Sequence, residues 1–187
     1  MPTNPWVSPA NNTSWSSGAA GTTLATAATL AISPSTTTAP DYTLAGGVLY
    51  PGMVIRFTAA GIWTCGSTAT NATFALMYGG TGGTVLATSG AVAMLASQTH
   101  VSWYINAILS CRSAGSSGTV WTTGQVSGIV AAAPMSDSRM DSAVFGTPAV
   151  ATINTTTASA LVLNGTLSQI TGSPTITCEQ WLIELIG

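Results

Sequence analysis

Apolar and polar residues alternate along much of the chain, most clearly in one stretch of thirteen residues. Between His100 and Arg112, every second residue from Val101 to Cys111 is apolar, and the residues between them are mostly polar. Ile108 is the one exception to this alternation. A period of two residues is typical of a β-strand that has one face on a core. The pattern predicts a long strand, of the kind found where a sheet also forms a surface between subunits.

Shorter alternating runs are separated by glycine-rich segments. Similar patterns occur in Leu24–Ile32 and after Pro51–Gly52, where Met53, Ile55 and Phe57 share one face. The segment Gly79–Gly83 lies between two such runs and predicts the loop of a hairpin.

Further turn signals follow at short intervals along the second half of the chain. Gly115–Gly118 follows the long strand, and Asn164–Gly165 and Gly172–Pro174 predict turns around the later strands. We expect about eight to ten strands, and no segment has a helical period with caps. The predicted fold is all-β, an antiparallel β-sandwich of jelly-roll kind over residues 22–187.

The first 21 residues differ from the rest and predict an extended N-terminal arm. Pro2, Pro5 and Pro9 break helices, and Asn, Ser and Gly fill most of the positions between them. Trp6 and Trp15 are unusual in such a segment, because disordered tails usually lack tryptophan. We expect the arm to dock through these side chains onto its own domain or onto a neighbouring subunit.

Charged residues are nearly absent from this sequence. They make up 4% of the chain, there is no lysine, and the net charge is −2; a typical soluble domain has about 25% charged residues. Mixed surface charge keeps proteins apart, so a free monomer with so few charges is poorly protected against association. Either uncharged Thr, Ser, Asn and Gly cover the surface, or much of the surface is buried against other subunits; we favour the second interpretation.

Composition also excludes several classes of function. No run approaches the ~20 apolar residues of a membrane-spanning helix, and the N-terminus lacks the features of a signal peptide. Three scattered arginines do not form the basic patch that nucleic-acid binding requires. Cys65, Cys111 and Cys178 are far apart and odd in number, which predicts buried free thiols rather than disulfides or a zinc site.

The residues give little support to catalysis. His100 is the only histidine, and no Gly-x-Ser-x-Gly turn accompanies it. Glu179 and Glu184 are five positions apart, so on a regular strand they would face opposite sides and could not act together on a glycoside. We therefore expect neither an enzyme nor a cofactor.

A small acidic cluster is the remaining candidate site. Asp137 and Asp141 flank Arg139 in an expected loop. A calcium site would need carboxylates at closer alternating spacing, so an ion-pair cluster is the preferred interpretation and we expect no metal. Together with Trp6 and Trp15, these residues are candidate assembly contacts.

Several ordered motifs resemble a family of small virion proteins in tailed phages of actinobacteria and their relatives. The likeness covers about Leu49 to Gly187, and the arm lies outside it. Its motifs are Leu49–Met53 with Arg56 and Ala59–Gly61, Phe74–Gly80 with Gly83–Ala87, Trp103, Gly115–Val120, Ser159–Leu163, and Thr175–Gln180 with Glu184.

The resemblance implies a β-sandwich subunit, usually a homotrimer, that decorates the capsid or belongs to the tail. We expect a capsid decoration protein, made in the host cytoplasm, that lies on the virion surface and stabilises the lattice of the major capsid protein. The alternative is a minor tail or baseplate protein that binds a host glycan through Trp63, Trp103 and Trp121, although core packing is the preferred role for these tryptophans.

Overall fold

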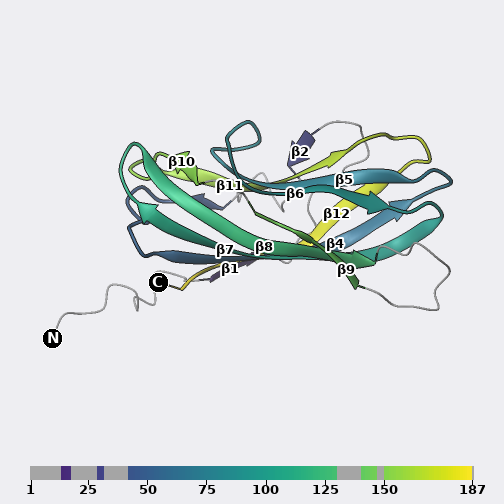
Figure 1. Cartoon of the computed structure of the whole chain (residues 1–187), viewed down its shortest axis with the longest axis horizontal. Helices are drawn as coiled ribbons and strands as arrows, with labels where there is room; N and C mark the ends of the chain where they lie inside the picture. Colours follow the sequence, from purple (N-terminus) through teal and green to yellow (C-terminus); the bar gives the residue numbers. More distant parts are fainter. Residues whose placement is uncertain (1–13, 18–28, 32–41, 130–139, 147–149, 187) are drawn as a thin grey trace.

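The computed structural model describes residues 14–17, 29–31, 42–129, 140–146 and 150–186. Within this part of the chain there are twelve β-strands and no helix. The strands form two antiparallel sheets that lie against each other as two layers (Figure 1). The predicted all-β sandwich is therefore confirmed, whereas its jelly-roll connectivity stays a prediction. The strands outnumber the expected eight to ten because several are only two to four residues long.

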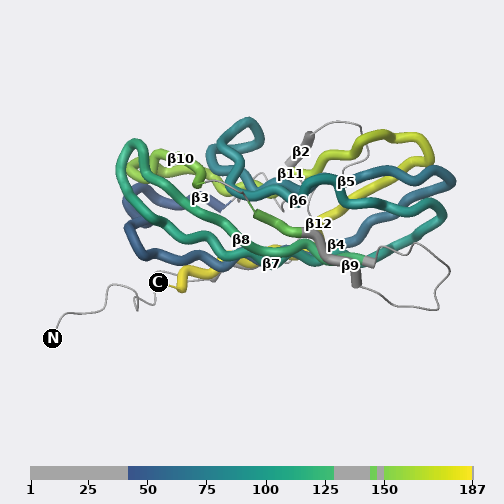
Figure 2. Tube along the Cα trace, in the orientation of Figure 1, coloured from purple at the N-terminus to yellow at the C-terminus, as the bar shows by residue number. Residues whose placement is uncertain are grey.

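The larger sheet has the order β1-β12-β4-β7-β8-β10, and β9 also pairs with β8. Its central strands are long and run along the length of the sandwich (Figure 2). The strands are β1 (Ser14–Ser17), β4 (Val54–Cys65), β7 (Gln98–Ser113), β8 (Gly118–Ile129), β9 (Met140–Val144), β10 (Ala151–Ile153) and β12 (Thr175–Leu185).

The smaller sheet has the order β2-β11-β5-β6, and β3 also pairs with β11. Its strands are β2 (Thr29–Ala31), β3 (Thr43–Leu44), β5 (Thr70–Tyr78), β6 (Thr84–Met94) and β11 (Ser159–Leu167). The loop between β5 and β6 is the hairpin predicted at Gly79–Gly83. Gly79 and Gly80 both have positive φ, 99° and 85°, which only glycine adopts without strain.

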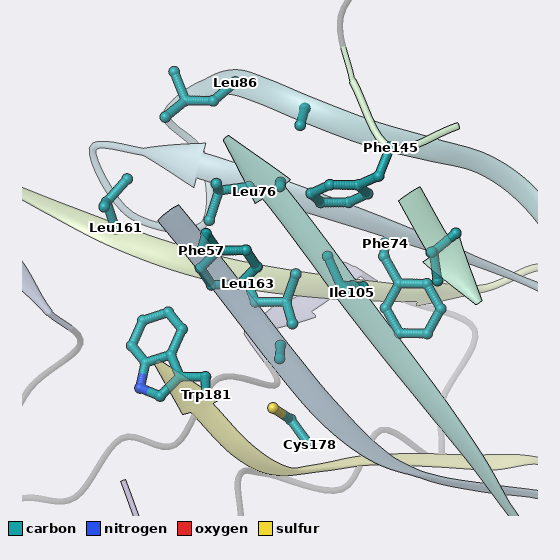
Figure 3. Close-up of a cluster of buried hydrophobic side chains, with 14 of the residues drawn as sticks. Phe57, Phe74, Leu76, Leu86, Ile105, Phe145, Leu161, Leu163, Cys178 and Trp181 are labelled. Atoms are coloured by element: carbon teal, nitrogen blue, oxygen red, sulfur yellow. The ribbon is translucent and has the colours of Figure 1, made fainter. Parts of the chain in front are cut away.

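The core lies between the two sheets and is built by the alternation seen in the sequence. Along β4, every second residue from Ile55 to Cys65 is buried. Phe57 meets Trp181 edge to face, with ring centroids 5.8 Å apart, and both side chains are fully buried. Figure 3 shows these rings among aliphatic side chains from both sheets. Burial of each such side chain stabilises the fold by about 1.5–3 kcal/mol.

One predicted turn is wrong. Asn164–Gly165 lies inside β11, where the chain pairs with β5 on one side and β2 on the other. The Asn164 side chain is buried, and its amide nitrogen donates a 2.9 Å hydrogen bond to the carbonyl oxygen of Thr81. Asn-Gly favours a turn locally, but pairing on both sides satisfies the backbone better here. The turn predicted at Gly172–Pro174 does separate β11 from β12.

The segment after β9 closes one long side of the sandwich. Phe145 is fully buried, and its backbone N–H donates to the carbonyl oxygen of Gly124 in the larger sheet. The next residue, Gly146, forms a bridge with Thr88 in β6 of the smaller sheet. Two adjacent residues therefore connect the edges of both sheets.

Two short strands from the N-terminal part of the chain lie along the opposite side. β1 pairs with Trp181–Glu184 of β12, and β2 pairs with Asn164–Thr166 of β11. The predicted arm, residues 1–21, thus includes one strand that adds to the larger sheet of its own chain. Trp15 belongs to this strand and its backbone is paired with Ile183.

Candidate interaction surface

The side of the larger sheet that faces away from the core is the most extended surface of the described chain. We call it the outer face. Four long strands, β12, β4, β7 and β8, lie side by side in it. The outer face comprises Thr175, Thr177, Glu179, Gln180, Leu182 and Glu184 of β12, Val54, Arg56, Thr58, Ala60, Ile62 and Thr64 of β4, Ser102, Tyr104, Asn106, Ile108, Ser110 and Arg112 of β7, and Trp121, Thr123 and Gln125 of β8.

β7 forms the middle of the outer face and carries its two exposed large apolar side chains. Tyr104 and Ile108 are each 40% exposed. Asn106 lies between them along the strand, with Thr58 as its partner on β4 and Gln125 as its partner on β8. Ile108 is the exception to the alternation of apolar and polar residues in the sequence. In the structure the alternation of buried and exposed side chains continues through it, and Ile108 lies on the solvent side.

The charges on the outer face neutralise each other. Arg56 Nη1 lies 3.3 Å from Glu184 Oε2, across the paired strands β4 and β12. Their side chains are 47% and 32% exposed, so water screens the pair and it contributes little to stability. Glu179 of β12 and Arg112 of β7 are the other two charged members of the outer face, so the face as a whole has no net charge. Its remaining seventeen members are uncharged.

The second described arginine, Arg112, lies at the end of the outer face. The guanidinium carbon of Arg112 is 5.4 Å from the centre of the Trp121 ring, within the range of a cation–π interaction. Trp121 is half-buried, whereas Trp63 and Trp103 are buried in the core. Core packing was the preferred role for all three tryptophans. It is confirmed for Trp63 and Trp103, whereas for Trp121 it is wrong, because this side chain is not part of the core cluster.

The prediction that Glu179 and Glu184 face opposite sides is wrong. A β-bulge between Cys178 and Gln180 adds one residue to β12 and reverses the parity after it. Both glutamates consequently lie on the solvent side. Five residues of strand still separate them by roughly 15 Å, beyond the ~9.5 Å upper limit for a glycosidase pair.

His100 lies near the start of β7 with its side chain exposed. Its φ of 54° is in the left-handed region, and its backbone N–H donates to Thr64 Oγ1 at 3.2 Å. Within the described residues, no group of three or more His, Cys, Asp or Glu side chains could hold a metal ion. The described part of the chain likewise has no helix able to span a membrane.

The three cysteines are buried and free, as predicted. Burial raises the pKa of all three thiols, and it raises that of Cys178 to about 12, to which the nearby charge of Glu179 adds. The Cys178 thiol donates to the carbonyl oxygen of Gln180 at 3.4 Å. Since the thiolate is the nucleophile, these protonated groups are poorly reactive.

A small pocket lies between the sheets at one end of the core. Its walls include Trp63, Phe74, Met94 and Trp103, and its volume is about 10 Å³. A cavity of this size has room for a single water molecule. It is too small to bind a substrate or cofactor.

The candidate assembly contacts predicted from the sequence fall largely outside the described structure. Trp6, Asp137 and Arg139 lie outside the described residues. Trp15 and Asp141 are in strands, where their backbones pair with Ile183 and Gly128 respectively. The outer face was not among these candidates. The signals that could have identified it were Tyr104 and Ile108 on the side of β7 that is otherwise polar.

Comparisons with protein-family models, with curated proteins and with solved structures found no match to this chain.

Proposed function

We propose that this protein is a structural subunit of a symmetric assembly, and that the assembly is the particle of a tailed phage. In this proposal it is a capsid decoration protein, a homotrimer that binds the major capsid protein and stabilises the head lattice. The phage assignment depends on the motif resemblance between Leu49 and Glu184. The proposed role as a subunit depends on the wide outer face and on its low content of charged residues.

The observation that carries the proposal is the wide, nearly uncharged outer face. A surface of Thr, Asn, Gln, Tyr and aliphatic side chains has few charges to repel a neighbouring protein. Interface centres are depleted in charge and enriched in tyrosine in the same way. By contrast, the described carboxylates and histidine are scattered over the surface, and the described pocket has room for only one water molecule.

The particle itself provides the test. Purified particles with and without the protein should be imaged by electron cryomicroscopy, and the copy number should be measured by quantitative gel analysis. A decoration protein predicts hundreds of copies and density that is lost from the head lattice. A handful of copies, with density lost from the tail, would instead support the minor tail or baseplate alternative. Absence of the protein from particles would refute both.

A glycan-binding role for the tail alternative has lost its main support. That role required an exposed cluster of Trp63, Trp103 and Trp121, and the first two are buried. Trp103 also donates its indole N–H to the carbonyl oxygen of Ile62 at 3.3 Å, which fixes the ring within the sandwich. The decoration proposal does not depend on any of these rings.

A further inference from the structure

We propose that the outer face packs against the same face of a second copy of this chain. The inference rests on the proposed role as a subunit of an assembly. A contact between identical faces joins copies in pairs, so it is additional to the contact that forms the proposed homotrimer. It starts from two large side chains with apolar surface, Tyr104 and Ile108, which are exposed in the middle of this face.

The area of the outer face matches what a stable contact needs. β4 has 12 residues. At roughly 3.3 Å per residue and 4.8 Å between strands, four such strands cover about 40 Å by 19 Å, or about 750 Å². A standard protein interface buries about 800 Å² on each partner. The face is therefore large enough to hold two copies together without help from another surface.

The charge of the outer face suits contact with an identical face. Near a rotation axis each side chain meets its own counterpart, so a net charge there would repel itself. The middle of the face contains Tyr104, Asn106 and Ile108, none of which is charged. Arg56 and Glu184 already pair within one chain, so burial of the face leaves neither of these two charges without a partner. The other two charges of the face, Glu179 on β12 and Arg112 near the end of β7, lie away from its middle.

The side chains around Tyr104 and Asn106 also suit contact with a second copy. On β4, Ala60 is the neighbour of Tyr104, and its small side chain leaves space beside the ring. Asn106, flanked by Thr58 and Gln125, provides hydrogen-bonding groups at the centre of the face. Tyrosine in particular adds a large apolar ring with a polar end, which is a frequent anchor in protein interfaces.

Lysine substitutions on the outer face test the proposal. Tyr104→Lys and Ile108→Lys should each raise the dissociation constant of the assembly at least tenfold, measured by sedimentation equilibrium. Ile170→Lys is the matched control, because Ile170 is 51% exposed and lies in the connection between β11 and β12. Circular dichroism and thermal melting should verify that each variant is folded. Since both target side chains are exposed, the folded state tolerates the new charge.

A mixing experiment identifies the partner surface. Tyr104→Lys and Tyr104→Glu proteins should each dissociate alone and associate with each other, since opposite charges then meet across the interface. Folded variants that keep the wild-type mass would overturn the proposal. So would single variants that dissociate but do not recover when mixed, because the face would then contact a different surface.

These outcomes are separable from those of the proposed function. If the wild-type protein is an oligomer and the outer-face variants keep its full mass, only the inference fails. If particles lack the protein, the proposed function fails whether or not the purified chain self-associates. A wild-type protein that is monomeric at high micromolar concentration would overturn the inference directly.

Discussion

Cys178 is the residue whose protonation should govern stability at high pH. Its thiol is buried and its pKa is raised from 9.0 to about 12. In the unfolded chain the thiol loses its proton near pH 9, while the folded protein retains it. Its contribution to stability is therefore complete below pH 9 and is lost as the pH rises towards 12.

We expect the free energy of unfolding of the wild type to fall with pH more steeply than that of Cys178→Ala. The difference should be about 1.4 kcal/mol per pH unit between pH 9 and 12. Urea denaturation at a series of pH values measures both slopes. The substitution also leaves a cavity, which lowers stability at every pH, so the slopes rather than the absolute values decide. Parallel slopes would contradict the burial of a protonated thiol.

Some residue positions were predictable from the sequence and others were not. The buried positions of β4 and β7 follow from alternation, because each buries one face of a regular strand. The orientation of Glu184 does not follow from alternation, because it depends on the β-bulge between Cys178 and Gln180. The residue types in Cys178–Gln180 do not indicate a bulge. Ile108 was recognisable in the sequence as an apolar residue at a position expected to be polar. Such a residue indicates an interaction surface only when its neighbours on the adjacent strands are known.

The elements were predictable wherever local signals and tertiary pairing agree. The hairpin loop Gly79–Gly83 and the turn Gly115–Gly118 are glycine-rich and lie between strong strands, and both occur as predicted. Asn164–Gly165 carried an equally strong local signal, yet it lies within β11. Pairing with β2, β3 and β5 involves residues far apart in the chain, which a local signal does not contain.

β1 should protect the edge of the larger sheet. It pairs with Trp181–Glu184, so its removal leaves backbone groups of β12 without partners. Deletion of residues 1–21 should therefore speed hydrogen exchange in Trp181–Glu184, while amides of β7 in the middle of the sheet keep their protection. The deletion should also increase association at high concentration, because an unpaired edge is a template for another strand.

The matched control for this deletion is a shorter one, residues 1–13, which leaves β1 in place. Mass spectrometry of peptides that cover β12 measures the exchange rates in both variants. Equal exchange in the two variants would show that β1 does not pair with β12 in solution.

At the scale of the whole molecule, the described structure combines a well-packed interior with a surface of low charge. The core provides stability without disulfides, since the three cysteines are free. The outer face has no net charge, and the pocket described between the sheets has room for one water molecule. The described residues therefore present an extended surface of low charge, which is the property that the proposed role in an assembly requires.

The salt dependence of self-association should follow from this composition. Only 4% of the residues are charged, and the outer face is neutral, so apolar burial rather than charge attraction should drive the contact. Sodium chloride screens charges but hardly affects apolar burial, whereas sulfate strengthens it. We expect the dissociation constant to change less than threefold between 50 mM and 1 M sodium chloride, and to decrease in ammonium sulfate. Sedimentation equilibrium in both salt series measures this. Dissociation by sodium chloride would instead indicate that charged residues outside the outer face hold the copies together.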